Sequence, residues 1–263
     1  MLLAYVIALI IYTLVSCHLA WALLRLKPIA KGFTLGMLLV ALVAHAITLY
    51  PNIYTLHGLN FNVFNTASLT SFYFVLFYVI FCFYRPILSL GLFAAPTAII
   101  GLSLGYFGVA PYAPLTDISK GLEAHIILSI AAYCVLLMAA VQAVILRIQI
   151  RELKHKTKQR FWVNKLPSLQ SMESLLFDMI LVGFSLLTLA LAIGFVYVSD
   201  LMAQHIAHKT VFSIMSWLLF GWLLFGHWKY GWRGRRAANM AILAFLLLAV
   251  GFIGSKFVLE MLL

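Results

Sequence analysis

Eight runs of about 20 apolar residues, separated by charged or turn-forming segments, dominate this chain of 263 residues. A helix of that length crosses the roughly 30 Å hydrocarbon core of a bilayer. The runs predict helices near 2–24, 33–51, 66–84, 87–106, 122–147, 174–197, 210–228 and 237–258. Eight such spans use about 160 residues and leave only short connections. We therefore predict an all-α polytopic membrane bundle in one integral membrane domain over 1–263, which excludes a water-soluble enzyme.

Basic residues lie between the apolar runs and divide unequally between the two sides of the membrane. Of 18 Lys and Arg, 15 fall in one set of alternate connections, and only Lys120, Lys209 and Lys256 fall in the other. Such an excess marks the cytoplasmic side, so both termini are predicted to be extracytoplasmic. The stretch 148–168 is predicted to be the one extended cytoplasmic loop. The net charge of +11 thus indicates topology and contact with membrane lipid, and we expect no nucleic-acid partner.

The cysteines and acids do not form a catalytic motif. Cys17, Cys82 and Cys134 each lie inside an apolar run, and the chain has neither CxxC nor CxxCH. Dithiol redox chemistry and covalent haem attachment are therefore not expected, and we predict that the protein is not an enzyme. Asp178, the one acid well inside a run, is predicted to pair with basic residues of the preceding loop rather than to relay protons.

Histidines within apolar runs are the most informative polar residues, since ionisable groups are costly in a membrane. By the predicted orientation, His45 and His125 lie towards the outer face, and His18 and His227 towards the inner face. Two neutral imidazoles from different helices suit bis-histidine ligation of haem iron. The alternative is that each histidine only forms hydrogen bonds between helices, and the spacing leaves both interpretations open.

Polar neighbours follow the two outer histidines at helical spacing. His45 shares a face with Thr48 and Asn52, and His125 shares one with Ser129 and Tyr133. Each stripe is predicted to face protein or water rather than lipid.

Three stretches resemble the cytochrome c assembly family of haem-handling membrane proteins, which includes the CcsA, CcmC and HemX types. They are Gly121-Leu-Glu-Ala-His125 and the residues that continue to Tyr133, then Gly183 to Gly194, and then Ser216-Trp217 through His227 to Gly231-Trp-Arg-Gly-Arg-Arg-Ala-Ala238. The resemblance covers about 121–263. The first 120 residues resemble only the YpjD-type inner-membrane branch, through Ala44-His45-Ala46-Ile47 in particular.

The resemblance implies roles for particular histidines. It makes His125 the counterpart of an outer haem ligand and His227 that of an inner one, with His45 and His18 as candidate partners chosen by depth. It also implies non-covalent haem b, cytochrome c maturation proteins as partners, and a bacterial inner membrane location. The family's tryptophan-rich motif, which forms an outer haem platform, has no counterpart here, because the segment 199–210 contains no tryptophan.

Three functions are therefore considered. We expect a haem-binding, multi-pass inner-membrane protein related to cytochrome c biogenesis. The alternatives are transmembrane electron transfer through two haems, and a transporter or accessory membrane subunit without a cofactor.

Overall fold

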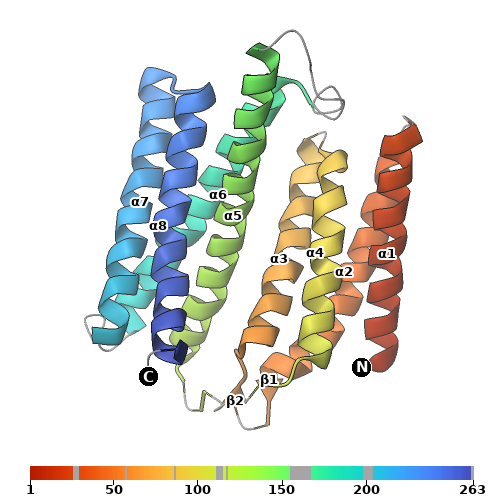
Figure 1. The fold of residues 1–263 in the computed structure, drawn as a ribbon. Coiled ribbons are helices and arrows are strands. Elements are labelled where there is room, and N and C mark those ends of the chain that lie inside the picture. Colours follow the sequence, from red (N-terminus) through yellow and green to blue (C-terminus); the bar gives the residue numbers. More distant parts are fainter. Residues whose placement is uncertain are drawn as a thin grey trace. The chain divides into compact units, whose positions relative to one another are not determined.

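A computed structural model of the chain describes residues 1–25, 30–56, 58–85, 87–110, 115–116, 118–154, 167–197 and 204–261. Eight α-helices account for most of these residues (Figure 1): α1 (Leu2–Arg25), α2 (Lys31–Ile53), α3 (Val63–Tyr84), α4 (Gly91–Phe107), α5 (Lys120–Lys154), α6 (Leu169–Tyr197), α7 (Gln204–Tyr230) and α8 (Gly234–Met261). A short hairpin of β1 (Tyr54–Thr55) and β2 (Gly58–Leu59) joins α2 to α3, and the 3₁₀ turn η1 (Leu88–Leu90) precedes α4. The predicted all-α bundle is confirmed.

The predicted spans agree with the helices in number and order. Seven of the helices are long and apolar enough to cross a membrane, and α4, with 17 residues, is shorter because the chain starts this span as the 3₁₀ turn η1. The main difference is at the end of α5, which continues to Lys154. The prediction of a loop from 148 onward is therefore wrong for 148–154. Arg, Gln, Glu, Leu and Lys are good helix formers, so the helix persists after the apolar run has ended.

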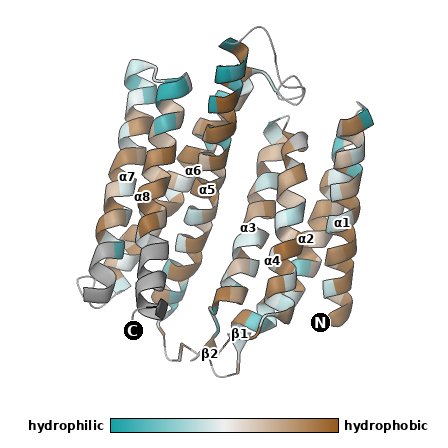
Figure 2. Cartoon of the chain, in the orientation of Figure 1, coloured by the Kyte–Doolittle hydropathy of each residue, from teal (hydrophilic) through white to brown (hydrophobic). Residues whose placement is uncertain are grey.

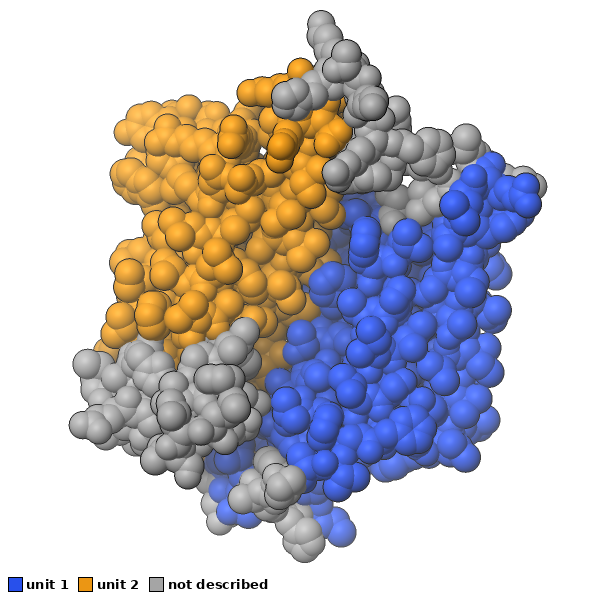
Figure 3. Space-filling model, in the orientation of Figure 1, with its two compact units in different colours: residues 1–118 blue, residues 119–263 orange. Residues whose placement is uncertain are grey.

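The chain divides into two compact units, residues 1–118 and 119–263 (Figure 3), a division that the sequence did not predict. In the first unit α1 and α3 each pack against both α2 and α4, and in the second α5 and α7 each pack against both α6 and α8. Each unit is thus a four-helix bundle in which every helix has two neighbours along the ring.

Small residues allow close helix packing in the first unit. Gly101 and Gly105 of α4 face Ser71 and Ser68 of α3, and a Cβ at Gly105 would lie 2.6 Å from that of Ser68. The GxxxG spacing in α4 therefore serves helix contact, as such spacings commonly do in membranes.

The α5–α6 pair of the second unit is held by side chains that bond to backbone carbonyls. Gln142 of α5 donates to the carbonyl oxygen of Met172 at 3.0 Å, and Gln149 donates to that of Pro167 at 2.9 Å. Further along, Gly183 makes room for Leu136, since a Cβ there would lie 2.5 Å from a Leu136 methyl carbon. These contacts set the register of the two helices.

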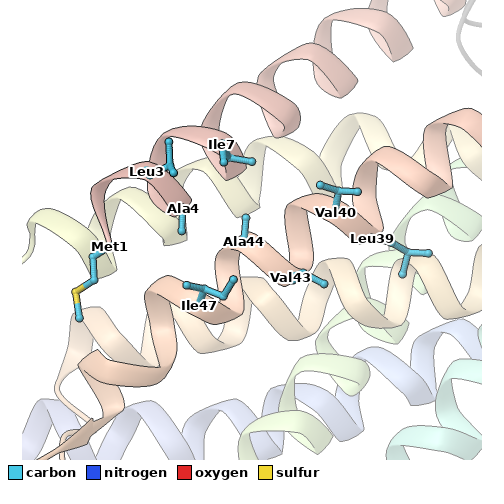
Figure 4. Close-up of a pocket in the computed structure, with 9 residues that line it drawn as sticks. All are labelled: Met1, Leu3, Ala4, Ile7, Leu39, Val40, Val43, Ala44 and Ile47. Atoms are coloured by element: carbon cyan, nitrogen blue, oxygen red, sulfur yellow. The ribbon is translucent and has the colours of Figure 1, made fainter.

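Figure 2 shows mostly hydrophobic colour along the middle of the helices. A groove of about 630 Å³ lies between α1 and α2 of the first unit (Figure 4). It is lined by Met1, Leu3, Ala4, Ile7, Leu39, Val40, Val43, Ala44 and Ile47. Because all nine side chains are apolar, the groove suits lipid acyl chains and offers no group for chemistry.

Candidate functional site

His125 lies in the second turn of α5 and is clamped against α6. Its Nδ1 lies 2.7 Å from the carbonyl oxygen of Ala190. A carbonyl can only accept, so Nδ1 carries a proton, and in the neutral imidazole the lone pair is therefore on Nε2. Gly194, one turn further along α6, leaves space for the ring, because a Cβ there would lie 2.6 Å from the His125 Cε1.

His227 lies in the last turn of α7 and has the same protonation pattern. Its Nδ1 lies 2.9 Å from the carbonyl oxygen of Trp232, which again places the proton on Nδ1. One face of the imidazole stacks on Phe177 of α6, with the ring centroids 3.5 Å apart and an interplanar angle of 17°. The ring is therefore held by three parts of the chain.

The segment after α7 folds back onto the end of that helix. Gly231 has a φ of +65°, a conformation that glycine adopts without strain, and this turns the chain. The ring of Trp232 then lies on Gly226, where a Cβ would overlap it, and the guanidinium of Arg236 lies 3.8 Å from the Trp232 ring centroid. Trp228, a sequence neighbour of His227, is 83% exposed.

The two histidines occupy separate sites at opposite ends of the second unit, whose helices can be followed in Figure 1. His125 contacts Ala190, and His227 contacts Phe177, and both partners belong to α6. Ala190 lies thirteen positions after Phe177, which corresponds to about 20 Å along a helix axis.

His45 of α2 is fully buried in the first unit. Its Nε2 lies 3.0 Å from the Ser68 hydroxyl of α3, and its Nδ1 lies 3.4 Å from the Tyr12 hydroxyl of α1. The imidazole thus links three helices and uses both ring nitrogens to do so. Iron ligation by His45 would require the loss of one of these bonds. Its predicted pairing with His125 joins residues of different units and stays a prediction.

His18 of α1 differs from His45 in having an unused nitrogen. Its Nε2 is buried and has no hydrogen-bond partner within the residues that the structure describes. The ring lies beside Trp21, with the centroids 6.5 Å apart. An unpartnered imidazole nitrogen is compatible with a ligand role, and the predicted pairing of His18 with His227, again across units, stays a prediction.

The polar stripe that follows His45 faces protein, as predicted. Thr48 is buried and donates to the carbonyl oxygen of His45 at 2.7 Å, and Asn52 donates to that of Gly105 at 3.3 Å. In the other stripe, Tyr133 packs against Phe245 of α8, with the ring centroids 5.3 Å apart.

Two adjacent residues of a family-like stretch join α7 to two different helices. Ser216 donates to the carbonyl oxygen of Ala244 on α8 at 2.8 Å. The Nε1 of Trp217 donates to the Thr188 hydroxyl of α6 at 2.8 Å, and its ring stacks on Phe184. The stretch 216–217 therefore has a packing role that its sequence did not reveal.

Clustered metal ligands do not occur in the described part of the chain, where no three His, Cys, Asp or Glu side chains come together. Cys82 and Cys134 are buried and Cys17 is exposed, and none of the three forms a disulfide bond. Most of the predicted cytoplasmic loop lies outside the described residues, in the segment 155–166. Part of the segment that lacks tryptophan also lies outside them, in 198–203.

The helices and the histidines define a polytopic membrane protein with two clamped imidazoles at the opposite ends of a four-helix unit. The chain matches the family described as Cytochrome C assembly protein over residues 34–263, and it belongs to that family. It is 29% identical over 228 residues to Inner membrane protein YpjD of Escherichia coli (strain K12), with 83% of each chain covered. An uncharacterized 28.8 kDa protein of Azospirillum brasilense is 32% identical over 170 residues, or 62% of each chain. No solved structure matches the chain.

These comparisons confirm the resemblance to the family and to the YpjD-type branch, and they identify a multi-pass protein of the bacterial inner membrane related to cytochrome c biogenesis. The family match begins at residue 34, well before the predicted start near 121.

Proposed function

We propose that this protein binds haem b non-covalently, with His125 and His227 as iron ligands at two separate sites, and handles haem during cytochrome c biogenesis. The cytochrome c assembly family provides the context. The proposal includes cytochrome c maturation proteins as partners and assigns no catalytic step to this chain.

The observation that carries the proposal is that both imidazoles donate a hydrogen bond from Nδ1 to a backbone carbonyl. Histidines that bind metals nearly always donate their other ring N–H to a carbonyl or carboxylate, which sets the tautomer and the ring orientation. His125 and His227 do so towards Ala190 and Trp232, and each keeps Nε2 as a lone-pair donor. Neutral imidazole nitrogens are the axial ligands of many haem proteins. His125 and His227 therefore fit the role of haem ligands.

The groups around each histidine have distinct roles in this proposal. The carbonyl oxygens of Ala190 and Trp232 hold the proton at Nδ1 and so keep Nε2 basic. Phe177 covers one face of His227 and excludes water from it. Arg236, held on the Trp232 ring, provides a cation nearby that suits a propionate carboxylate. Haem, when bound, would supply a redox-active iron.

The test is the haem content of the purified protein and of two single variants, His125→Ala and His227→Ala. Since the sites are separate, each variant is expected to lose the haem of its own site and to retain that of the other. His45→Gln serves as the matched control, and its haem content is expected to equal that of the unchanged protein. Folded protein without haem, after expression with ample haem supply, would overturn the proposal.

A further inference from the structure

A groove with a basic rim lies between α5 and α8 of the second unit and has a volume of about 460 Å³. The rim is formed by Arg147, Arg151 and Lys154 of α5 together with Arg235 of α8. The described residues that line the groove include no acid, and the nearest one along α5, Glu152, is not among them. The groove therefore gathers four positive charges without a carboxylate in its lining.

Helix geometry explains this gathering of charge. Arg147, Arg151 and Lys154 are spaced i, i+4 and i+7, which places them on one face of α5. Arg235 follows the first residue of α8 and lies against that face. Figure 2 shows the hydrophilic colour at this end of α5 and α8, beyond the apolar middle of both helices. Like charges on one face repel one another, and a bound anion reduces that repulsion.

The groove is amphiphilic along its length. Ile148 and Ile150 line it beside the basic residues. Val144 and Ile242, about a turn or two closer to the middle of their helices than the arginines, continue the apolar lining away from the rim. With 35 residues, α5 is about 52 Å long, whereas the hydrocarbon core is roughly 30 Å thick. The charged turns of α5 therefore extend past the core to the level of the lipid headgroups, while the apolar part of the groove remains within it.

We propose that this groove binds an anionic phospholipid, with the phosphate at the basic rim and an acyl chain along the apolar part. Basic pockets between membrane helices commonly take such headgroups. A small free anion would use only the rim and leave the apolar part unexplained. The groove is separate from the ligand site at the end of α7, since neither His227 nor Phe177 lines it, so the proposal does not depend on haem.

The experiment is native mass spectrometry of the full chain, released from detergent after exposure to equal amounts of phosphatidylglycerol and phosphatidylcholine. The unchanged protein is expected to retain phosphatidylglycerol preferentially. Arg151→Gln should weaken this preference by about fivefold, and Arg147→Gln/Arg151→Gln/Arg235→Gln should abolish it. The matched control, Arg25→Gln/Lys229→Gln/Arg233→Gln, removes three exposed charges elsewhere and should leave the preference unchanged.

Two further arms distinguish lipid binding from the binding of a free anion and from a loss of folding. Arg147→Lys/Arg151→Lys/Arg235→Lys keeps the charges and should retain the preference, which also covers the case in which the glutamine triple variant fails to fold. Excess inorganic phosphate should not displace phosphatidylglycerol. Displacement by phosphate, equal retention of the two lipids, or an unchanged preference in folded Arg151→Gln would overturn the proposal.

Discussion

The Nδ1 of His125 lies 2.7 Å from the carbonyl oxygen of Ala190, one helical turn from a glycine that leaves room for the same imidazole. The relationship recurs at the other end of the unit, where Nδ1 of His227 lies 2.9 Å from the carbonyl oxygen of Trp232 and a glycine accommodates the Trp232 ring. Each ring is thus oriented by a carbonyl and has a nearby glycine that permits the arrangement. The buried His45, by contrast, is bonded through both nitrogens.

Gly194→Ala should disturb the His125 site without changing any histidine. The new Cβ would lie 2.6 Å from Cε1 of His125, so the imidazole must move and its bond to Ala190 must lengthen. We expect the haem content to fall as far as in His125→Ala, measured on purified protein. Gly36→Ala is the control, because a Cβ at Gly36 has no atom within 4 Å. Full haem content in Gly194→Ala would contradict the role of Gly194 in positioning His125.

Gly226→Ala should affect only the His227 site. Its Cβ would overlap the Trp232 ring, which would displace the carbonyl that holds the His227 Nδ1. We expect loss of the haem at His227 and retention of that at His125, seen as half the haem per chain. Gly221→Ala on the same helix, where the Cβ would lie 3.4 Å from the Phe184 ring, should keep both. Loss of haem from both sites would show that the two are coupled.

His45→Leu should lower stability and leave haem in place. The substitution leaves the Tyr12 and Ser68 hydroxyls without their imidazole partner, at a cost of about 1–3 kcal/mol. Thermal unfolding in detergent can be followed with a thiol-reactive fluorogenic dye in a Cys17→Ser background. Cys82 and Cys134 are buried and react only on unfolding, whereas the exposed Cys17 would react in the folded protein. A lower unfolding temperature with full haem content is expected. Loss of haem with unchanged stability would instead make His45 a ligand.

The charge asymmetry predicts that both termini are extracytoplasmic. Alkaline phosphatase fused after Leu263 should therefore be active, since that enzyme matures only outside the cytoplasm, whereas a fusion within the basic segment 155–165 should be inactive. The reverse pattern would invert the orientation and exchange the outer and inner assignments of His125 and His227.

The sequence predicted the helices because the apolar thickness of a bilayer sets their minimum length. It also placed His125 and His227 at opposite ends of their unit, since helical rise and the Lys and Arg distribution locate a residue along the membrane normal. It did not predict the end of α5, where charged helix formers continue the helix past the apolar run.

The sequence did not predict the contacts between helices. Phe177 is one of 20 phenylalanines, and nothing in its neighbourhood marks it as the ring beneath His227. Gly194 lies in a stretch that resembles the family, yet its contact with His125 depends on the register of α5 and α6. Gln142 and Gln149 set that register through bonds to backbone carbonyls distant in sequence. His45 was grouped with the ligands by depth alone, and only its neighbours Tyr12 and Ser68 reveal the role in packing.

Rescue of a ligand-deleted variant by imidazole tests the central claim most directly. His125→Gly and His227→Gly each remove one axial nitrogen and leave a space of the size of imidazole. The visible absorption spectra of the purified proteins, oxidised and reduced, should lose the haem absorption of the affected site and regain it when imidazole is added. Colourless, folded protein without the substitutions, or spectra that neither variant alters, would contradict the assignment of His125 and His227 as haem ligands.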